Sequence, residues 1–146
     1  MSTASLVVND QVAALPWRRH GGILEILLIT TRTTKRWIVP KGWLETGLSQ
    51  SESAAREALE EAGVIGEIGA RPVGKFHYTK RRRTGEMLPV QVTLFPLEVM
   101  RQRRAYPEKH LRETRWCRVE EALAHISEPG LKRLVLKFAK EIAAAA

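Results

Sequence analysis

The stretch PKGWLETGLSQSESAAREALEEAGV, residues 40–64, holds the features that decide the fold. Ser49 and Glu52 have the spacing of a capping box, and Gly63 is of the type that ends helices. We therefore expect a helix between them, entered from a glycine-rich loop. Small apolar residues recur along it at helical spacing and would let it pack very close to a neighbour: Ala55, Ala58, Leu59 and Ala62.

The opposite side of this helix is acidic. Glu57, Glu60 and Glu61 stand at i, i+3 and i+4, so their carboxylates share one face and repel one another unless a cation neutralises them. A hard divalent ion such as Mg²⁺ binds through a few carboxylates, waters and phosphates of a substrate. The alternative is a solvated acidic face. We favour the metal site, because Lys41 and Gly42 precede the helix and Arg56 adjoins the acidic residues.

The same residues resemble a known motif. Gly42 and the run Arg56-Glu57-Ala58-Leu59-Glu60-Glu61-Ala62-Gly63-Val64 are similar to the Nudix box of the Nudix hydrolases. Its pattern is G, five residues, E, seven residues, R-E-U-x-E-E-x-G-U, where U is aliphatic. The resemblance covers essentially the whole chain and implies one Nudix domain over residues 1–146. The fold that it implies is an α/β/α sandwich around a mixed β-sheet.

The resemblance also implies the chemistry. Mg²⁺ or Mn²⁺ would be held by Glu57, Glu60 and Glu61, with the Gly42 carbonyl as a further ligand. Arg56 would belong to the catalytic set. Glu113, before the last strand, is placed like a residue that supplies a further ligand or a general base in several Nudix enzymes, and Glu57 is the other candidate for the base. A surface carboxylate paired with a neighbouring arginine is the alternative for Glu113.

One position departs from the motif. Leu48 stands where the family has its first glutamate, which generally supports the box arginine. Glu45 and Glu52 are the candidates to replace it, and a loop repacked around an apolar side chain is the alternative. Leu48 also motivates a rival interpretation, in which the chain is a Nudix-like module that binds phosphate or RNA without hydrolysis.

The charge of the chain points to a polyanionic partner. Its formal net charge is +8 although the box is acidic, so basic residues concentrate elsewhere. The candidates for contact with substrate phosphates are Arg36, Lys41, Lys80, Arg81, Arg82 and Arg83. Residues 80–83 lie at an expected turn, where a solvated loop tip is the alternative. Trp43 could stack on a base or cover the core.

These features predict a hydrolase that cleaves a phosphoanhydride bond in a polyphosphorylated small molecule. Residues 36–40 (RWIVP) and the end of the box look most like the diphosphoinositol polyphosphate and diadenosine polyphosphate phosphohydrolases. Removal of pyrophosphate from the 5′ end of RNA is the alternative, since a basic surface also holds an RNA backbone. A monomer and a homodimer are both compatible with the sequence.

The flanking sequence predicts strands on both sides of the early helix. Residues 11–18 and 22–30 would form a hairpin, and residues 36–40, 90–97 and 114–119 would be further strands. Pro16, Pro89 and Pro96 suggest edge or bulge positions. A short helix over residues 119–126 and a final amphipathic helix after Pro129 complete an α/β pattern around a mixed sheet. We expect the final helix to pack on the core rather than on a membrane.

Location is predicted from three features. Met1 to Ser5 lack the basic start and apolar block of a signal peptide. The longest aliphatic run, residues 26–29, is too short to span a bilayer. Cys117 is the only cysteine, so it has no internal disulfide partner, and a packing role is expected for it. The chain is therefore predicted to be cytoplasmic.

Overall fold

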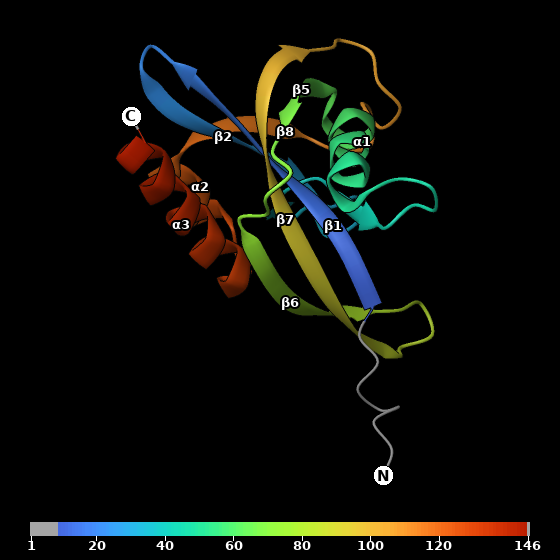
Figure 1. The fold of residues 1–146 in the computed structure, drawn as a ribbon. Coiled ribbons are helices and arrows are strands. Elements are labelled where there is room, and N and C mark those ends of the chain that lie inside the picture. Colours follow the sequence, from blue (N-terminus) through green and yellow to red (C-terminus); the bar gives the residue numbers. More distant parts are fainter. Residues whose placement is uncertain (1–8, 146) are drawn as a thin grey trace.

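The structure is a computed structural model that describes residues 9–145. A mixed β-sheet lies between one helix on one side and two helices on the other (Figure 1). The strands are β1 (Asn9–His20), β2 (Ile23–Thr30), β3 (Trp37–Ile38), β4 (Lys41–Trp43), β5 (Val64–Ile68), β6 (Gly74–Arg81), β7 (Met87–Gln102) and β8 (Thr114–Arg118), and the helices are α1 (Gln50–Ala62), α2 (Val119–His125) and α3 (Pro129–Ala145). The predicted α/β sandwich is confirmed. Residues 1–5, on which the absence of a signal peptide was judged, lie outside the described range.

The centre of the sheet is the parallel pair β1 and β7, which runs in register from Asn9 opposite Val90 to Trp17 opposite Glu98. The other described pairings are antiparallel: β1 with β2 and β4, β2 with β3 and β8, and β7 with β5 and β6. The predicted hairpin of β1 and β2 is present, with Gly21 and Gly22 at positive φ in its turn.

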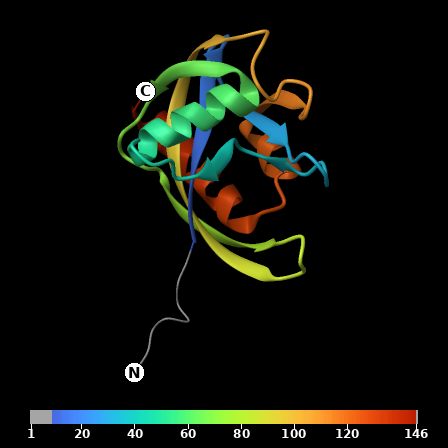
Figure 2. The ribbon, with the colours of Figure 1, turned by 90° about the vertical axis from the view of Figure 1, so that its right-hand side faces the viewer.

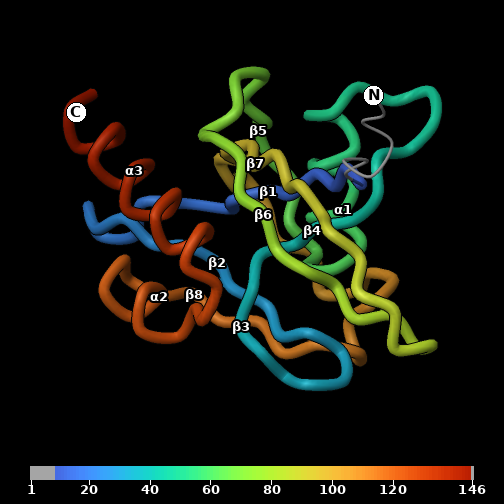
Figure 3. Tube along the Cα trace, turned by 90° about the horizontal axis from the view of Figure 1, so that it is seen from below, coloured from blue at the N-terminus to red at the C-terminus, as the bar shows by residue number. Residues whose placement is uncertain are grey.

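Each face of the sheet has its own core, because successive side chains of a strand point to opposite faces. Val12 and Ala14 of β1 pack with α1, whereas Ala13 and Leu15 pack with α2 and α3. Seen from below, α1 and the pair α2 and α3 lie on opposite sides of β1 and β7 (Figure 3). Cys117 is fully buried in the second core, so its predicted packing role is confirmed.

Helix α1 has the predicted ends. The Ser49 hydroxyl accepts from the Glu52 N–H, the Glu52 carboxylate accepts from the Ser49 N–H, and Gly63 adopts the left-handed conformation after the last turn. The helix crosses in front of the sheet in Figure 2.

The buried stripe of α1 differs from the predicted one. It consists of Ala54, Ala58 and Ala62, while Ala55 and Leu59 are half-buried. Glu61 is buried beside this stripe, so the prediction that all three carboxylates point away from the sheet is wrong for Glu61. The error arises because Glu61 is seven residues after Ala54, which returns it to nearly the same side of the helix.

The predicted edge positions of two prolines are wrong. Pro16 and Pro96 lie in the two central strands, where Pro16 pairs with Leu97 and Pro96 with Leu15. Each proline lies at the point where, on the side facing away from the other central strand, its strand stops pairing with one neighbour and starts pairing with the next. The missing N–H is tolerated there. On β1, β4 pairs up to Ala13 and β2 pairs from Trp17. On β7, β6 pairs up to Leu94 and β5 pairs from Leu97. Pro89 pairs with Thr79 of β6 and precedes Val90, where the pairing of β7 with β1 begins, so its predicted edge position is confirmed within the described residues.

The predicted strand over residues 36–40 is shorter and continues differently. Only Trp37 and Ile38 pair with β2, after which the Pro40 carbonyl accepts the Ala14 N–H and the chain crosses to β1 as β4. This crossing carries Lys41 and Gly42 from the edge of the sheet to α1.

The predicted C-terminal helices are both present. The apolar stripe of α3 is buried through Leu131, Leu134, Val135 and Phe138, so the core-packing interpretation is confirmed. Within residues 9–145, none of the helices combines the length and the apolar character needed to cross a bilayer.

Candidate active site

A cluster of carboxylates lies at the junction of β4 and α1. It contains the three predicted residues of α1, together with Glu45 from the loop before the helix and Glu108 from the loop between β7 and β8. Burial raises the pKa of Glu57, and electrostatic repulsion from Glu60, Glu45 and Glu108 raises it further. A hydrogen bond with Glu61 acts in the opposite direction. The structure therefore brings the predicted acidic residues together and adds Glu45, named from the sequence only as a candidate partner of Arg56, and Glu108, which the sequence did not indicate.

Gly42 lies directly against this cluster, which is possible because glycine has no side chain. A Cβ atom at this position would lie 2.5 Å from Glu57 Oε2 and 2.7 Å from Glu57 Oε1, closer than real contacts allow. The peptide N–H of Lys41 donates to Glu61 Oε1 at 3.2 Å. Residues 41 and 42 thus contact both ends of the acidic face of α1, while the predicted ligand set stays a prediction.

Glu61 is the most buried member of the cluster, with 6% of its surface exposed. Burial raises its pKa to about 8, although the Arg112 guanidinium, whose Nη2 lies 3.5 Å from Glu61 Oε2, acts in the opposite direction. Repulsion from Glu57 and Glu108 adds to the effect of burial. A carboxylate with this pKa binds a proton readily near neutral pH unless a cation replaces it.

Arg112 is the residue that sequence reasoning missed. Its Nε donates to Glu108 at 2.9 Å, its Nη1 donates to the Thr30 carbonyl at 3.0 Å, and its Nη2 faces Glu61. The side chain is only 12% exposed. The charge run HLRETR around it gave no local signal that this arginine, rather than Arg115, turns inward.

Glu113 differs from the expectation. It is exposed, its N–H donates to Thr30 Oγ1, and its carbonyl accepts the Thr30 N–H, so its backbone anchors the loop to β2. The carboxylate from this loop that acts on Glu57 and Glu61 is Glu108, whose N–H donates to the Glu60 carbonyl. A role of Glu113 as ligand or base stays a prediction.

Arg56 has two carboxylate partners. Its Nε lies 3.1 Å from Glu60 Oε1 and 3.4 Å from Glu45 Oε2. Glu52, the other candidate partner, is engaged in the capping box with Ser49. Leu48 is half-buried in the loop between them.

A cavity of about 250 Å³ lies on the α3 side of the sheet, and Lys41, whose peptide contacts Glu61, belongs to its lining. It combines two cations, a phenol and apolar walls, and it is lined by Thr31, Arg36, Ile38, Val39, Lys41, Phe76, Tyr78, Ser127, Glu128 and Leu131. Lys41 Nζ lies 2.9 Å from the Tyr78 hydroxyl, and burial lowers the pKa of this lysine. Through its peptide and its side chain, Lys41 joins the carboxylates to the cavity.

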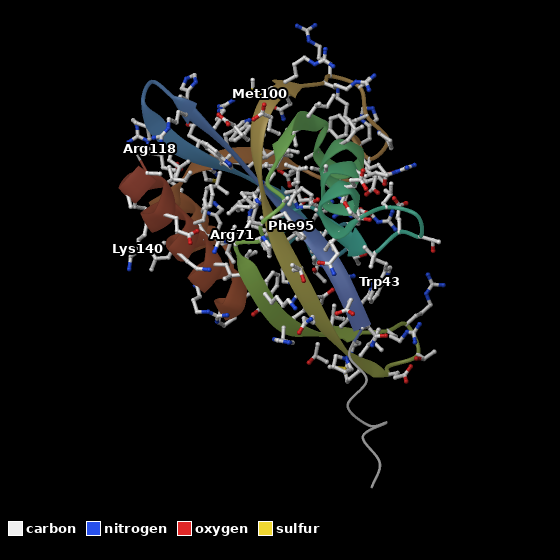
Figure 4. The ribbon with its side chains drawn as sticks, viewed as in Figure 1. Trp43, Arg71, Phe95, Met100, Arg118 and Lys140 are labelled. Carbon is white, nitrogen blue, oxygen red and sulfur yellow. The ribbon has the colours of Figure 1, made fainter. Side chains whose placement is uncertain are left out.

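The basic turn lies apart from this cavity. Lys80 ends β6 with its Nζ 5.4 Å from the centre of the Trp43 ring, and Arg82 pairs with Glu86 at 3.4 Å. Arg81 and Arg83 are exposed. Trp43, labelled in Figure 4 beside the β6–β7 hairpin, is 42% exposed, and both base stacking and covering of the core stay predictions for it.

The chemistry of the donor set fits a hard divalent cation. The cluster offers only carboxylate and carbonyl oxygens, two of its carboxylates have raised pKa values, and Glu45 Oε2 is buried without a hydrogen-bond partner. Within residues 9–145, no three His, Cys, Asp or Glu side chains are arranged as a ready-made ion-binding group. The reason is local, since Glu61 faces Arg112 and Glu60 faces Arg56.

We predict that Arg112→Ala lowers the free energy of unfolding by about 3 kcal/mol, because it leaves Glu61 and Glu108 without their buried counter-charge. Urea unfolding monitored by circular dichroism measures the change. Arg115→Ala is the matched control: this arginine is 48% exposed in its pair with Glu121, and its loss should cost less than about 1 kcal/mol. Equal losses in the two variants would contradict a structural role for Arg112.

We also predict that the metal-free protein loses stability as the pH rises from about 5 to about 8.5. The folded pKa of Glu61 is about 8 and its ordinary value is 4.5, so the folded protein retains a proton that the unfolded chain releases. This contribution is fully present below the ordinary value and is lost as the pH rises through the folded one.

Thermal unfolding of wild type and Glu61→Gln in excess EDTA measures this effect, with the exposed Glu67→Gln as the matched control. The Glu61→Gln curve should fall less steeply with pH, because glutamine does not ionise. If Glu61→Gln and Glu67→Gln have the same pH dependence as wild type, Glu61 does not carry the effect.

Comparisons with known proteins agree with this geometry. The NUDIX domain family matches residues 8–138. Nudix hydrolase 21, chloroplastic, of Arabidopsis thaliana is 36% identical over 116 residues, which are 77% of this chain and 57% of that protein. Diphosphoinositol polyphosphate phosphohydrolase 3-beta of Bos taurus is 42% identical over 60 residues, 40% of this chain and 36% of that protein. The chain spans about half the length of the curated relatives that it matches first. Since one relative's name includes "chloroplastic", cytoplasmic location stays a prediction.

Solved structures show the same fold. An Ap4A hydrolase of C. elegans, solved as a binary complex, has a TM-score of 0.71 and 22% sequence identity. The match covers 94% of this chain and 99% of that one. With the family match over most of the chain and the box glutamates gathered in the second half of α1, this chain belongs to the Nudix family.

Proposed function

We propose that the protein hydrolyses a phosphoanhydride bond in a polyphosphorylated small molecule, using Mg²⁺ or Mn²⁺. One observation carries the proposal: residues 41 and 42 contact Glu61 and Glu57 of α1, and Lys41 also lines a cavity together with Arg36. Carboxylates that hold a cation and cations that hold phosphates are thereby adjacent. Nudix hydrolases generally use divalent metal ions.

Glu57, Glu60, Glu61 and the Gly42 carbonyl would hold the metal. Bound there, it would supply neutralisation of phosphate oxygens and a lowered pKa of a coordinated water. The half-buried Glu57, whose pKa is raised chiefly by burial, is the first candidate for the general base. The exposed Glu113 is the alternative base. Lys41 and Arg36 would orient the phosphates and stabilise charge on the leaving group.

The cavity supports a small-molecule substrate. Its volume of about 250 Å³ accommodates part of a nucleotide or an inositol ring. Phe76 and Leu131 give it apolar walls suited to a base, whereas Arg36 and Lys41 suit further phosphates. We therefore retain both dinucleoside polyphosphates and diphosphoinositol polyphosphates as substrate classes. These correspond to the named activities of an Ap4A hydrolase of the same fold and of the Bos taurus relative.

A second candidate is removal of 5′-pyrophosphate from RNA. The exposed Trp43 beside Lys80, next to the arginines of the turn, resembles the pairing of an aromatic platform with cations in single-strand binding. Binding without hydrolysis, motivated by Leu48, is the remaining alternative. A competition assay separates them: diadenosine polyphosphate, diphosphoinositol polyphosphate and triphosphorylated RNA are offered together at moderate salt, and release of products is followed by mass spectrometry.

We predict that Glu60→Gln and Glu61→Gln each lower kcat for the preferred substrate by more than about 100-fold, beyond the loss typical of residues around a metal's ligands. The exposed Glu67→Gln removes one charge from the neighbouring strand β5 and serves as the control. Calorimetry with Mn²⁺ should show weakened metal binding in the first two variants only. Unchanged turnover in both would exclude the assignment, and tight ligand binding without product release by wild type would favour the binding module.

We predict that Arg81→Ala together with Arg82→Ala raises KM about tenfold at low salt, with little effect at high salt, where exposed charges are screened. Arg101→Ala together with Arg104→Ala is the matched control, because both are exposed and Arg101 lies near the opposite end of β7 from the turn. If turnover of all three substrates is the same in both double variants, the turn is a solvated loop tip.

A further inference from the structure

The loop before α1 folds back on itself where the box departs from its usual pattern. The Leu48 N–H donates to the Glu45 carbonyl at 3.3 Å, and Gly47 between them has a φ of 89°. A positive φ of this size suits glycine and allows the tight reversal. Leu48 therefore closes a turn whose first residue is Glu45.

A second contact fixes Glu45 against the helix. Its N–H donates to Ser53 Oγ at 3.3 Å, and Ser53 is fully buried. Ser53 and Arg56 are three residues apart on α1 and hence neighbours on its surface. This places the Glu45 side chain where its Oε2 reaches Arg56 Nε at 3.4 Å.

The Arg56 and Glu45 side chains are 56% and 40% exposed, but Glu45 Oε2 itself is buried and has no hydrogen-bond partner among the described residues. Arg56 is the cation that faces this oxygen. The same guanidinium binds Glu60 at 3.1 Å. Both carboxylates raise the pKa of Arg56, and Glu60 has the larger effect. Arg56 thus bridges a loop carboxylate and a carboxylate of the box.

We propose that Glu45 replaces the glutamate missing at position 48, as the positioning residue that orients Arg56 and, through it, Glu60. Glu45 lies three residues before position 48. It can take this role because the turn closed by Leu48 brings the Glu45 side chain back to α1. The effect of Glu45 on catalysis rests on the proposed function, whereas the contacts of Glu45 with Arg56 and Ser53 do not depend on it. The apolar Leu48 is then a repacked loop residue that leaves the box arginine supported.

The test compares Glu45→Gln, Leu48→Glu and the double variant with Glu52→Gln. Glu52→Gln is the matched control, since it removes the same charge at the same helix end and glutamine keeps the capping box. The first readout is the NMR signal of the Arg56 Nε–H in metal-free protein, assigned with Arg56→Lys. We expect this signal to shift and exchange faster in Glu45→Gln, to be unchanged in Glu52→Gln, and to recover in the double variant.

The second readout is Mn²⁺ affinity, measured by electron paramagnetic resonance, with kcat and KM measured in parallel. Glu45→Gln should weaken Mn²⁺ binding about tenfold, and Leu48→Glu should restore it in the Glu45→Gln background while adding little to wild type. If Glu45→Gln matches Glu52→Gln in both the Arg56 signal and Mn²⁺ affinity, the proposal is overturned. If Leu48→Glu adds the same increment with and without Glu45, the two positions are independent and the proposal also fails.

The two proposals fail in different ways. A wild-type protein that hydrolyses none of the substrates overturns the proposed function, yet the Arg56 signal and the Mn²⁺ affinity still report on Glu45. If the wild-type protein binds no Mn²⁺, the Arg56 Nε–H signal alone tests whether Glu45 orients Arg56. A thermal unfolding scan of each variant separates a lost pairing from a lost fold.

Discussion

The mutual repulsion of the carboxylates around α1 is the constraint on which the site depends. Five glutamates, at positions 45, 57, 60, 61 and 108, influence one another at the end of β4 and along α1. Two arginines limit the cost: Arg56 binds the exposed side of the cluster and Arg112 the buried side. The compensation is incomplete, since Glu57 and Glu61 still have raised pKa values. Negative charge therefore remains incompletely neutralised at the place where we propose that a metal ion binds.

Close packing of α1 creates this tension. Ala54, Ala58 and Ala62 are fully buried against β1, β5 and β7, and such small side chains let the helix axis lie near the sheet. Glu61 follows the same side of the helix and is carried inward with them. Larger residues in this stripe would lift the helix and return Glu61 to water, where its pKa would fall toward the ordinary value. Close packing also restricts position 42, because the Glu57 carboxylate occupies the space that a side chain would need there.

Local signals in the sequence were enough to predict α1, its caps, the first hairpin and the final helix. Each depends on residues within a few positions of one another, as Ser49 and Glu52 do. The errors over Pro16 and Arg112 have a common cause in long-range pairing. Pro16 could not be placed correctly, because its tolerance depends on a partner switch between β4 and β2. Arg112 was missed because its contacts are with Thr30 and Glu61, 82 and 51 positions away. The Nudix resemblance supplied the ligand candidates, but it could not reveal Glu108 or the reach of Glu45.

The distribution of positive charge matters more for phosphate recognition than its total. The formal net charge of +8 includes many exposed residues, whose fields salt screens strongly. Lys41 is different: burial lowers its pKa, and it lies between Tyr78 and the carboxylates of α1. A lysine that is poorly hydrated gains more from an arriving phosphate than one at the β6–β7 turn, because less water must be displaced to form the contact. Recognition of the scissile phosphates should therefore depend on Lys41 and the cavity, while the turn adds long-range attraction. This division of roles explains how one chain can be strongly basic and still keep an acidic centre available for a cation.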